Sequence, residues 1–358
     1  MKGRVLIAGF ATRHVAWSAA KAGYAVYAVD HFCDQDLSWY TMDRLKFEEL
    51  EELPDRIAEM AGRHAIDFFV PTSGAETIGT ALPLSGTDRT TAARLLDKLE
   101  VQRFFEGEGI PVPPLAAEDD FPYIAKPRTG AGGWRNAVIR SRDDLDRWLR
   151  EGEGAEPLLQ KQVGGLPASV SCLADGNHAV ALAVNEQLLR GGDASPFGFT
   201  GSVTPLDHPL AGRMQALAVQ AAGASGCVGS AGVDFVLGRD AIAIEVNPRF
   251  QATVDTVEAA TGLNLFSLHM DACRGILPAT APAPRCCAAR RILFADRDLV
   301  VREDLSGFAP HVTDIPWPGT SFEEGQAVVS AFGTGRDREG AMQDLVNTLN
   351  KLERYMRG

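Results

Sequence analysis

The pattern of apolar and polar positions is most regular between residues 233 and 249, where it predicts a β-hairpin. Apolar and polar residues alternate on both sides of a turn at 238–240, which is typical of two short antiparallel strands. One register makes a whole face of the hairpin apolar, as a core-facing surface requires. That register pairs Val233, Phe235 and Leu237 with Val246, Ile244 and Ile242.

The same register places two carboxylates opposite each other on the polar face. Asp234 then faces Glu245, and Asn247 follows on the same side. Facing carboxylates repel and destabilise a strand pair, unless a divalent cation lies between them, because Mg²⁺ takes oxygen ligands from a few carboxylates and from substrate phosphates. Arg249 follows with a fork of donors for phosphate or carboxylate. The pattern predicts a magnesium–nucleotide site, and the alternative is a solvated acidic face.

The N-terminal part has the pattern of an open parallel sheet. A β-α-β unit and one further strand are predicted over 4–10, 13–22, 25–30 and 67–70. The first turn lacks G-x-G-x-x-G, so a dinucleotide is not expected. Open α/β sheets bind ligands beyond the carboxyl ends of their strands. Arg13 and Glu76 are predicted there as substrate contacts, with a solvated turn as the alternative for Glu76.

A glycine-rich loop between two strands is the second candidate for phosphate binding. A helix-compatible stretch over 88–109 and a proline-rich exit precede a strand over 121–128, the loop 129–133 and a second strand. Backbone N–H groups in such a loop can close around phosphate oxygens. Lys126, at the end of the first strand, supplies a positive charge next to them.

Further elements follow in order along the chain. The pattern predicts a helix over 143–150, a strand over 157–163, a hairpin over 168–189, a helix over 254–274, strands over 288–294 and 327–332, and a final helix over 338–356.

Composition narrows the class of protein. The chain has 358 residues, a hydrophobic share of 45% and a net charge of −12. These values are typical of a globular protein and argue against nucleic-acid binding, which needs a basic surface. No apolar run approaches the length of a membrane span. Six cysteines without zinc-type spacing fit reduced thiols in the cytoplasm.

Taken together, Lys126, the glycine loop and the series Asp234, Glu245, Asn247, Arg249 resemble the ATP-grasp superfamily. Within it, the chain looks most similar to predicted carboligases related to biotin carboxylase. The resemblance implies an α/β ATP-grasp fold with an α+β lid and a Rossmann-like N-terminal domain. The implied divisions are 1–87 (N-terminal substrate domain), 88–116 (linker), 117–190 (lid) and 191–358 (metal-bearing part with a C-terminal extension).

The resemblance also assigns roles to individual residues. It implies that Asp234, Glu245 and Asn247 bind Mg²⁺, with Mn²⁺ as the alternative, and that Arg249 and Lys126 act on the reacting groups. The implied ATP contacts are Lys98, Lys126, Gly130, Gly132, Gly133, Gln160, Lys161 and Val163. For Lys98 the alternative is an ordinary surface lysine. Gln160 stands where an acidic residue usually takes the adenine amine.

The reaction implied by the resemblance is ATP-dependent joining of a carboxylate to an amine through an acyl phosphate, with release of ADP and phosphate. Two alternatives stay open: a bicarbonate-dependent carboxylase or carbamoyl-phosphate-type enzyme, and a non-catalytic nucleotide-binding protein. The expected partners are small-molecule substrates, with no nucleic acid and no membrane, and a homodimer is allowed. Arg13, Arg249 and Arg190 are the candidate anion anchors.

Overall fold

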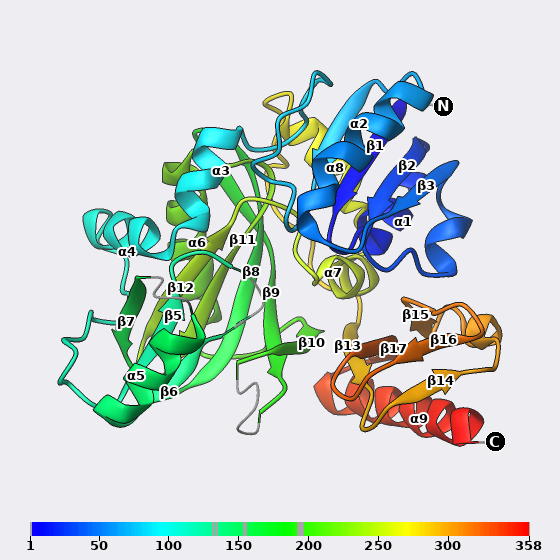
Figure 1. The fold of residues 1–358 in the computed structure, drawn as a ribbon. Coiled ribbons are helices and arrows are strands. Elements are labelled where there is room, and N and C mark those ends of the chain that lie inside the picture. The colour runs from blue at the N-terminus through cyan, green and yellow to red at the C-terminus, as the bar shows by residue number, and fades with distance from the viewer. Residues whose placement is uncertain (1, 131–132, 134, 153–155, 192–196, 358) are drawn as a thin grey trace.

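The computed structural model describes residues 2–130, 133, 135–152, 156–191 and 197–357. It combines a parallel sheet near the N-terminus, a small three-stranded sheet, and a large antiparallel sheet that extends into the C-terminal part. In Figure 1 the N-terminal sheet is blue, the small sheet is cyan to green, and the C-terminal helix is red. The α/β class predicted from the sequence is confirmed.

The N-terminal sheet has the strand order β3-β2-β1-β4, with every neighbouring pair parallel. Its elements are β1 (Arg4–Gly9), α1 (Arg13–Lys21), β2 (Ala25–Asp30), η1 (Asp36–Trp39), β3 (Asp43–Lys46), η2 (Leu50–Glu52), α2 (Leu53–Arg63) and β4 (Phe68–Pro71). The β-α-β prediction holds. Strand β3 was not predicted, because its sequence, DRLK, is polar at three of four positions.

The linker contains two helices rather than one, α3 (Arg89–Leu96) and α4 (Lys98–Gly107). Asp97 causes the break, since its carboxylate accepts the N–H groups of Leu99 and Glu100 and so caps a new helix. After α4 the chain runs extended, and Ala243 donates its N–H to Pro111. The linker is thereby fixed against the large sheet.

The segment predicted as the lid forms the three-stranded sheet β6-β5-β7 with one helix. Its elements are β5 (Tyr123–Pro127), β6 (Ala137–Ile139), α5 (Arg142–Glu151) and β7 (Pro157–Lys161). Tyr123, Leu145 and Trp148 belong to its own small core. Ser141 caps α5 by accepting the N–H of Asp144.

The large sheet has the order β12-β11-β8-β9-β10-β13-β17-β15. The elements of this part are β8 (Leu166–Asp175), β9 (Ala179–Leu189), β10 (Phe199–Thr204), α6 (Ala211–Ser225), β11 (Val228–Leu237), β12 (Ala241–Asn247), α7 (Val254–Thr261), α8 (Leu265–Ala272), β13 (Cys287–Phe294), β14 (Leu299–Val301), η3 (Leu305–Phe308), β15 (Val312–Thr313), β16 (Thr320–Phe322), β17 (Ala327–Gly335) and α9 (Arg338–Arg357). The predicted helix over 254–274 is split into α7 and α8 at Gly262, where φ is +73°.

The two faces of the large sheet differ in chemistry. On one face Ala168, Val170 and Phe235 join the core that includes Leu217 of α6. The other face carries buried polar groups, among them Ser169, whose hydroxyl accepts a hydrogen bond from the Asn185 amide at 3.3 Å. Because side chains alternate along a strand, this polar face also receives the polar side chains of β11.

The β11–β12 hairpin corrects part of the predicted register. Val233 pairs with Val246, and Asp234 pairs with Glu245, as expected. A bulge after Asp234 then shifts the pairing, so Phe235 faces Ala243 instead of Ile244. The buried face of β12 therefore consists of Ala241, Ala243 and Val246, while Ile242 and Ile244 are only partly buried. An extra residue at a bulge moves the following side chains by one position.

No helix in the described ranges is both long and apolar enough to cross a membrane.

Candidate functional site

The hairpin brings together the three residues predicted to hold a metal. Asp234 and Glu245 are direct cross-strand partners, and Asn247 lies between their carboxylates. The Asn247 amide donates to Asp234 Oδ2 at 3.3 Å and to Glu245 Oε1 at 3.4 Å. Burial and the nearby charge of Glu245 raise the pKa of Asp234 well above its usual value. A cation would relieve this repulsion, so the donor set fits Mg²⁺.

Asp234, Glu245 and Asn247 would supply only part of a coordination sphere to a cation at this position. Within the described residues there is no group of three or more His, Cys, Asp or Glu side chains that could hold a metal ion. Two carboxylates and an amide leave places for water and for substrate phosphate oxygens, which is how Mg²⁺ is usually held beside nucleotides.

Two glutamines that the sequence analysis did not select support Asp234. The Gln187 and Gln251 amides donate to Asp234 Oδ1 at 3.0 Å and 3.3 Å. Gly232 makes room for this contact, because a Cβ there would lie 1.8 Å from the Gln251 side chain. In the sequence, Gln251 could be connected with the site through its position two residues after Arg249. Gln187 could be connected with it only through the alternation of side chains along its strand.

Arg249 is held between the hairpin and the N-terminal domain. Its Nε donates to Glu76 Oε1 at 2.6 Å, and its Nη2 donates to Asn247 Oδ1 at 3.1 Å. The Glu76 side chain is 4% exposed and that of Arg249 is 11% exposed. The other Glu76 oxygen accepts the N–H of Gly74 at 2.7 Å. Glu76 thus orients Arg249, a role that differs from the predicted direct contact with substrate.

Two lysines face the hairpin from the linker and the lid. Lys126, on β5, is 7% exposed, and its ammonium group makes no hydrogen bond or ion pair within the described part of the chain. Burial lowers its pKa to about 8, although the charge of Glu245 opposes this shift. Lys98, at the start of α4, has a pKa lowered mainly by burial and also interacts with Glu245. Both ammonium groups therefore lie in the electrostatic field of Glu245.

The glycine loop is tied to the linker helix where it begins. Lys98 Nζ donates to the carbonyl of Gly130 at 2.7 Å, and the Lys98 N–H donates to the carbonyl of Arg128 at 2.8 Å. Gly133 has φ of +75°, and a Cβ there would lie 2.4 Å from the carbonyl oxygen of Phe197. Gly132 lies outside the described residues.

The predicted adenine hinge lies at the end of β7. Gln160 is 2% exposed, and its amide donates to Gln102 Oε1 at 2.6 Å. The side-chain oxygen of Gln160, Oε1, is buried and has no hydrogen-bond partner among the described residues. The Lys161 side chain points to the surface, where Nζ lies 2.7 Å from Asp120 Oδ2. Val163 is half-buried in the segment that follows β7.

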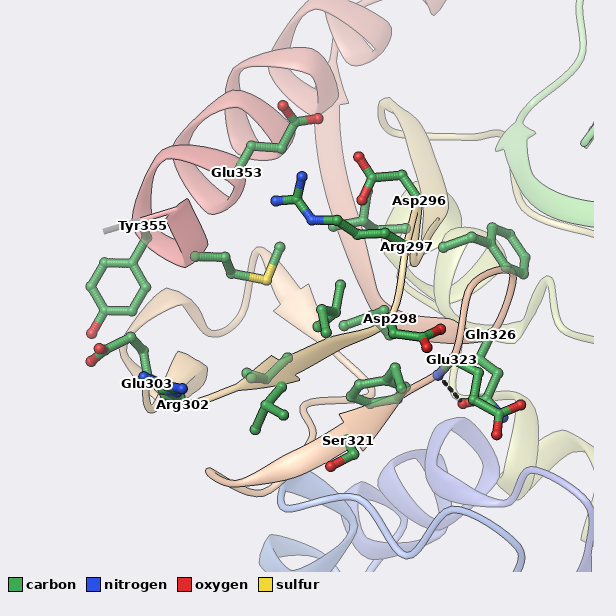
Figure 2. Close-up of a pocket in the computed structure, with 18 residues that line it drawn as sticks. Asp296, Arg297, Asp298, Arg302, Glu303, Ser321, Glu323, Gln326, Glu353 and Tyr355 are labelled. Atoms are coloured by element: carbon green, nitrogen blue, oxygen red, sulfur yellow. Dashed lines mark hydrogen bonds between the residues drawn. The ribbon is translucent and has the colours of Figure 1, made fainter.

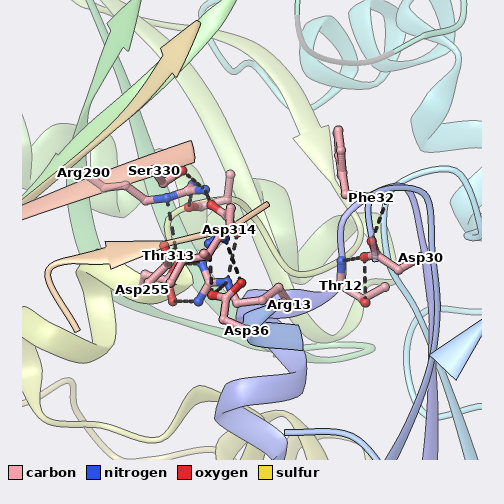
Figure 3. Close-up of polar contacts among 12 residues, drawn as sticks. Thr12, Arg13, Asp30, Phe32, Asp36, Asp255, Arg290, Thr313, Asp314 and Ser330 are labelled. Atoms are coloured by element: carbon pink, nitrogen blue, oxygen red, sulfur yellow. Dashed lines mark hydrogen bonds and ion pairs between the residues drawn. The ribbon is translucent and has the colours of Figure 1, made fainter. Parts of the chain in front are cut away.

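Arg13 is not an open anion anchor, which corrects the sequence prediction. It is buried, with Nη2 2.5 Å from Asp255 Oδ2 and Nε 2.9 Å from Asp314 Oδ1 and 3.6 Å from Asp36 Oδ2. Figure 3 shows Arg290 on the other side of Asp314, with its Nη2 2.5 Å from the Asp314 carboxylate. Burial opposes the charge on Asp314, but the two arginines outweigh it and hold the pKa well below its usual range.

Arg190 is also occupied away from the site. Its guanidinium lies over the ring of Phe294, 4.4 Å from the centroid, and donates to the Gly325 carbonyl.

A cavity in the C-terminal part is separate from the candidate site. It has a volume of about 960 Å³ and lies between β14, β16 and the end of α9 (Figure 2). Its lining contains charged groups such as Arg297 and Glu323, but none of the predicted site residues.

Comparison with known proteins identifies the class to which this fold and site correspond. Residues 95–253 match the family model of an ATP-grasp domain. The ATP-grasp resemblance inferred from the sequence is thereby confirmed for this part of the chain.

The relatives found by sequence are much longer than this chain. The carbamoyl phosphate synthase large chain of Deinococcus radiodurans is 29% identical over 287 residues, which cover 70% of this chain and 27% of that protein. The chain spans about a quarter of the length of the curated relatives it matches.

Solved structures with the same fold match over nearly the whole chain. A biotin carboxylase–beta-gamma-ATP complex from Campylobacter jejuni has a TM-score of 0.78 and 16% identity, and the match covers 95% of this chain and 89% of that one. The L-amino acid ligase of Bacillus licheniformis has a TM-score of 0.74 and 15% identity, with coverage of 98% and 97%. These matches confirm the ATP-grasp fold with its Rossmann-like N-terminal sheet.

Proposed function

We propose that this protein is an ATP-dependent ligase that joins a small carboxylate to an amine through an acyl phosphate and releases ADP and phosphate. The observation that carries the proposal is the meeting of Asp234, Glu245 and Asn247 with Lys98 and Lys126 at the junction of the hairpin, linker and lid. Oxygen ligands for a cation and two ammonium groups in one region suit transfer of a phosphoryl group.

Each residue has a role that follows from its environment. Asp234, Glu245 and Asn247 would hold Mg²⁺, which supplies neutralising charge to the phosphates when bound. Lys126 adds a positive charge from a buried position, where charge acts more strongly than in water. Arg249 is kept in place by Glu76, Asn247 and Phe250, and the N–H groups of Nη1 and Nη2 that these contacts leave over would donate to the reacting carboxylate or phosphate.

Two further groups of residues would contact the nucleotide. They are Gly130, Gly132 and Gly133 in the loop, and Gln160, Lys161 and Val163 at the hinge. Loop N–H groups would close over the phosphates and exclude the water that hydrolyses an acyl phosphate. The biotin carboxylase neighbour, described as a complex with beta-gamma-ATP, supports nucleotide binding in this fold. The six free cysteines support a cytoplasmic location.

Two of the similar proteins favour different reactions. The L-amino acid ligase supports a carboxylate–amine ligase, whereas the carbamoyl phosphate synthase relative supports the bicarbonate-dependent alternative.

Oxygen-18 transfer tests the proposal and separates it from its alternatives. The protein is incubated with ATP, Mg²⁺ and mixtures of amines with ¹⁸O-labelled carboxylic acids, and products are analysed by mass spectrometry. We expect ADP and phosphate that carries one label, because the acyl phosphate passes that oxygen to phosphorus. Labelled AMP would refute the mechanism. ADP release with bicarbonate alone would favour the carboxylase, and no turnover with any mixture would favour the non-catalytic protein.

A further inference from the structure

Three aromatic side chains meet at the carboxyl ends of β1 and β2. Phe10 follows β1, and His31 and Phe32 follow β2. The rings of Phe10 and His31 stack with centroids 4.5 Å apart, and Phe32 meets them edge-on at 5.3 Å and 4.9 Å. We call these three residues the ring cluster. In an open parallel sheet this edge is where ligands bind.

The ring cluster exposes apolar surface and packs on its inner side against a buried ring. Phe10 is 40% exposed and Phe32 is 36% exposed, whereas His31 leans on the buried ring of Phe47 at 5.6 Å. Neighbouring exposed aromatic rings are a frequent mark of a binding surface. Aromatic rings pair by offset stacking or edge-to-face contact. The exposed rings of Phe10 and Phe32 could therefore contact the planar group of a ligand in the same way.

Asp30 fixes the two loops that carry the rings. Its Oδ2 accepts the N–H and hydroxyl of Thr12 at 2.6 Å and 2.8 Å, and its Oδ1 accepts the N–H groups of Phe32 and Cys33 at 2.8 Å and 2.7 Å. Figure 3 shows the Asp30 carboxylate between Thr12 and the backbone below the Phe32 ring. The rings are therefore held in place before any ligand arrives.

A short series of contacts connects the ring cluster with Arg249. Phe10 donates its N–H to the carbonyl of Ser73 at 2.7 Å. The next residue, Gly74, donates to Glu76, and Glu76 holds Arg249 at 2.6 Å. A substrate on the ring cluster thus lies beside the loop that orients Arg249.

One carboxylate near the ring cluster, that of Asp34, is available to a cationic ligand. Asp34 follows Phe32 by two residues, and its carboxylate makes no hydrogen bond or ion pair with the residues that the structure describes. Burial, together with the charges of Asp314 and Asp30, raises the pKa of Asp34 well above its usual value. An ammonium group nearby would stabilise the charged carboxylate.

We propose that Phe10, His31 and Phe32 select the amine substrate by stacking on a planar, aromatic or heteroaromatic group that it carries. This inference rests on the proposed ligase function, because it assigns the substrate class of that reaction. The stacking surface lies on the N-terminal domain, whereas the proposed nucleotide contacts lie on the linker, lid and hairpin. The proposed function and the stacking inference can therefore be refuted independently of each other.

A matched pair of probes tests the stacking surface directly. Benzylamine and cyclohexylmethylamine carry the same amine on a planar and a saturated ring, and their binding to the full chain is measured by saturation-transfer NMR. We expect benzylamine to bind at least tenfold more tightly. The double variant Phe10→Leu, Phe32→Leu keeps apolar bulk and should lose this preference. Trp39→Ala is the control, because Trp39 is 44% exposed in the same domain and its ring partner is Tyr40.

Equal binding of the two probes, or a preference that survives in the double variant, would overturn the inference. ATP titration of the wild type and of Lys126→Ala is run in parallel. If ATP binding depends on Lys126 while the aromatic preference is absent, the stacking inference fails and the proposed function stands. If the aromatic preference is present but ATP does not bind, the proposed function fails and the ring cluster remains an amine-binding surface.

Discussion

Glu76→Gln should weaken both stability and activity, because one side chain serves two donors. The carboxylate accepts the Arg249 Nε–H with one oxygen and the Gly74 N–H with the other. Glutamine has a single carbonyl oxygen, so its NH₂ group must face one of these donors. The variant also leaves the Arg249 guanidinium without its charge partner in a setting where both side chains are nearly buried.

The expected loss of stability follows from these contacts. A hydrogen bond to a charged group contributes about 1.5–3 kcal/mol, and removal of one partner from a buried ion pair costs about 3–5 kcal/mol. Because Arg249 keeps its contacts with Asn247 and Phe250, we expect a loss nearer to the first of these values, about 2–3 kcal/mol, which for a chain of 358 residues is a fall in Tm of roughly 3–4 °C. The kcat should fall more than tenfold, with ATP affinity nearly unchanged, because Arg249 loses its orientation.

Calorimetry and steady-state ADP release measure the two effects. Asp67→Asn is the matched control, since Asp67 pairs with Arg4 in the same domain but both side chains are at least 40% exposed. Exposed pairs contribute about 0–1 kcal/mol, so its Tm should barely move. A Glu76→Gln protein whose Tm and kcat match those of Asp67→Asn would refute the assigned role of Glu76.

Further predictions concern the nucleotide, the metal and the buried arginine. Lys126→Ala should weaken ATP binding about 10- to 100-fold in calorimetric titration, whereas Lys161→Ala should not, and equal losses would mean that the hinge is misplaced. The pKa of Lys126 is lowered to about 8, so the ammonium is charged below that pH and neutral above it. ATP affinity should therefore fall as pH rises through about 8, and Lys126→Arg should remove the dependence; an unchanged profile would exclude Lys126 as the titrating group. Glu245→Gln should abolish turnover at saturating Mg²⁺ yet keep or raise Tm in chelator, since it removes a like-charge pair; normal turnover would refute the metal site. Arg13→Lys should lower Tm, because lysine lacks the fork that reaches several carboxylates, but leave the KM of the amine unchanged; a raised KM with unchanged Tm would restore Arg13 as a substrate contact.

The sequence predicted the pairing of Asp234 with Glu245 because only local information was needed. Asp234 and Glu245 are eleven positions apart on neighbouring strands, and the turn between them set their register. The register predicted beyond Asp234 was wrong, because the alternation of apolar residues in the sequence does not reveal a bulge. The sequence offers two isoleucines for the core, while the structure buries the small residues Ala241 and Ala243.

Contacts between distant segments could not be predicted in this way. Arg13 has a suitable side chain at a suitable strand end, yet its partners Asp255 and Asp314 come from segments more than 240 residues away. Glu76 was placed at the correct edge of the sheet, but its pairing with Arg249 depends on how two domains meet. Asp97 could be read as a helix cap only once the break between α3 and α4 was known.

The cluster around Arg13 has a consequence for synthesis of the chain. Arg13 emerges from the ribosome early, but Asp314 follows 301 residues later. Asp36 and Asp255 emerge before it, so until then the Arg13 guanidinium has only part of the negative charge that surrounds it in the final structure, and incompletely compensated buried charge is unfavourable. We therefore expect the N-terminal sheet to stay loosely docked during translation and to reach its final stability only when the C-terminal segment arrives. Nascent chains stalled before residue 314 should accordingly be cut more rapidly by protease near α1 than chains stalled after α9.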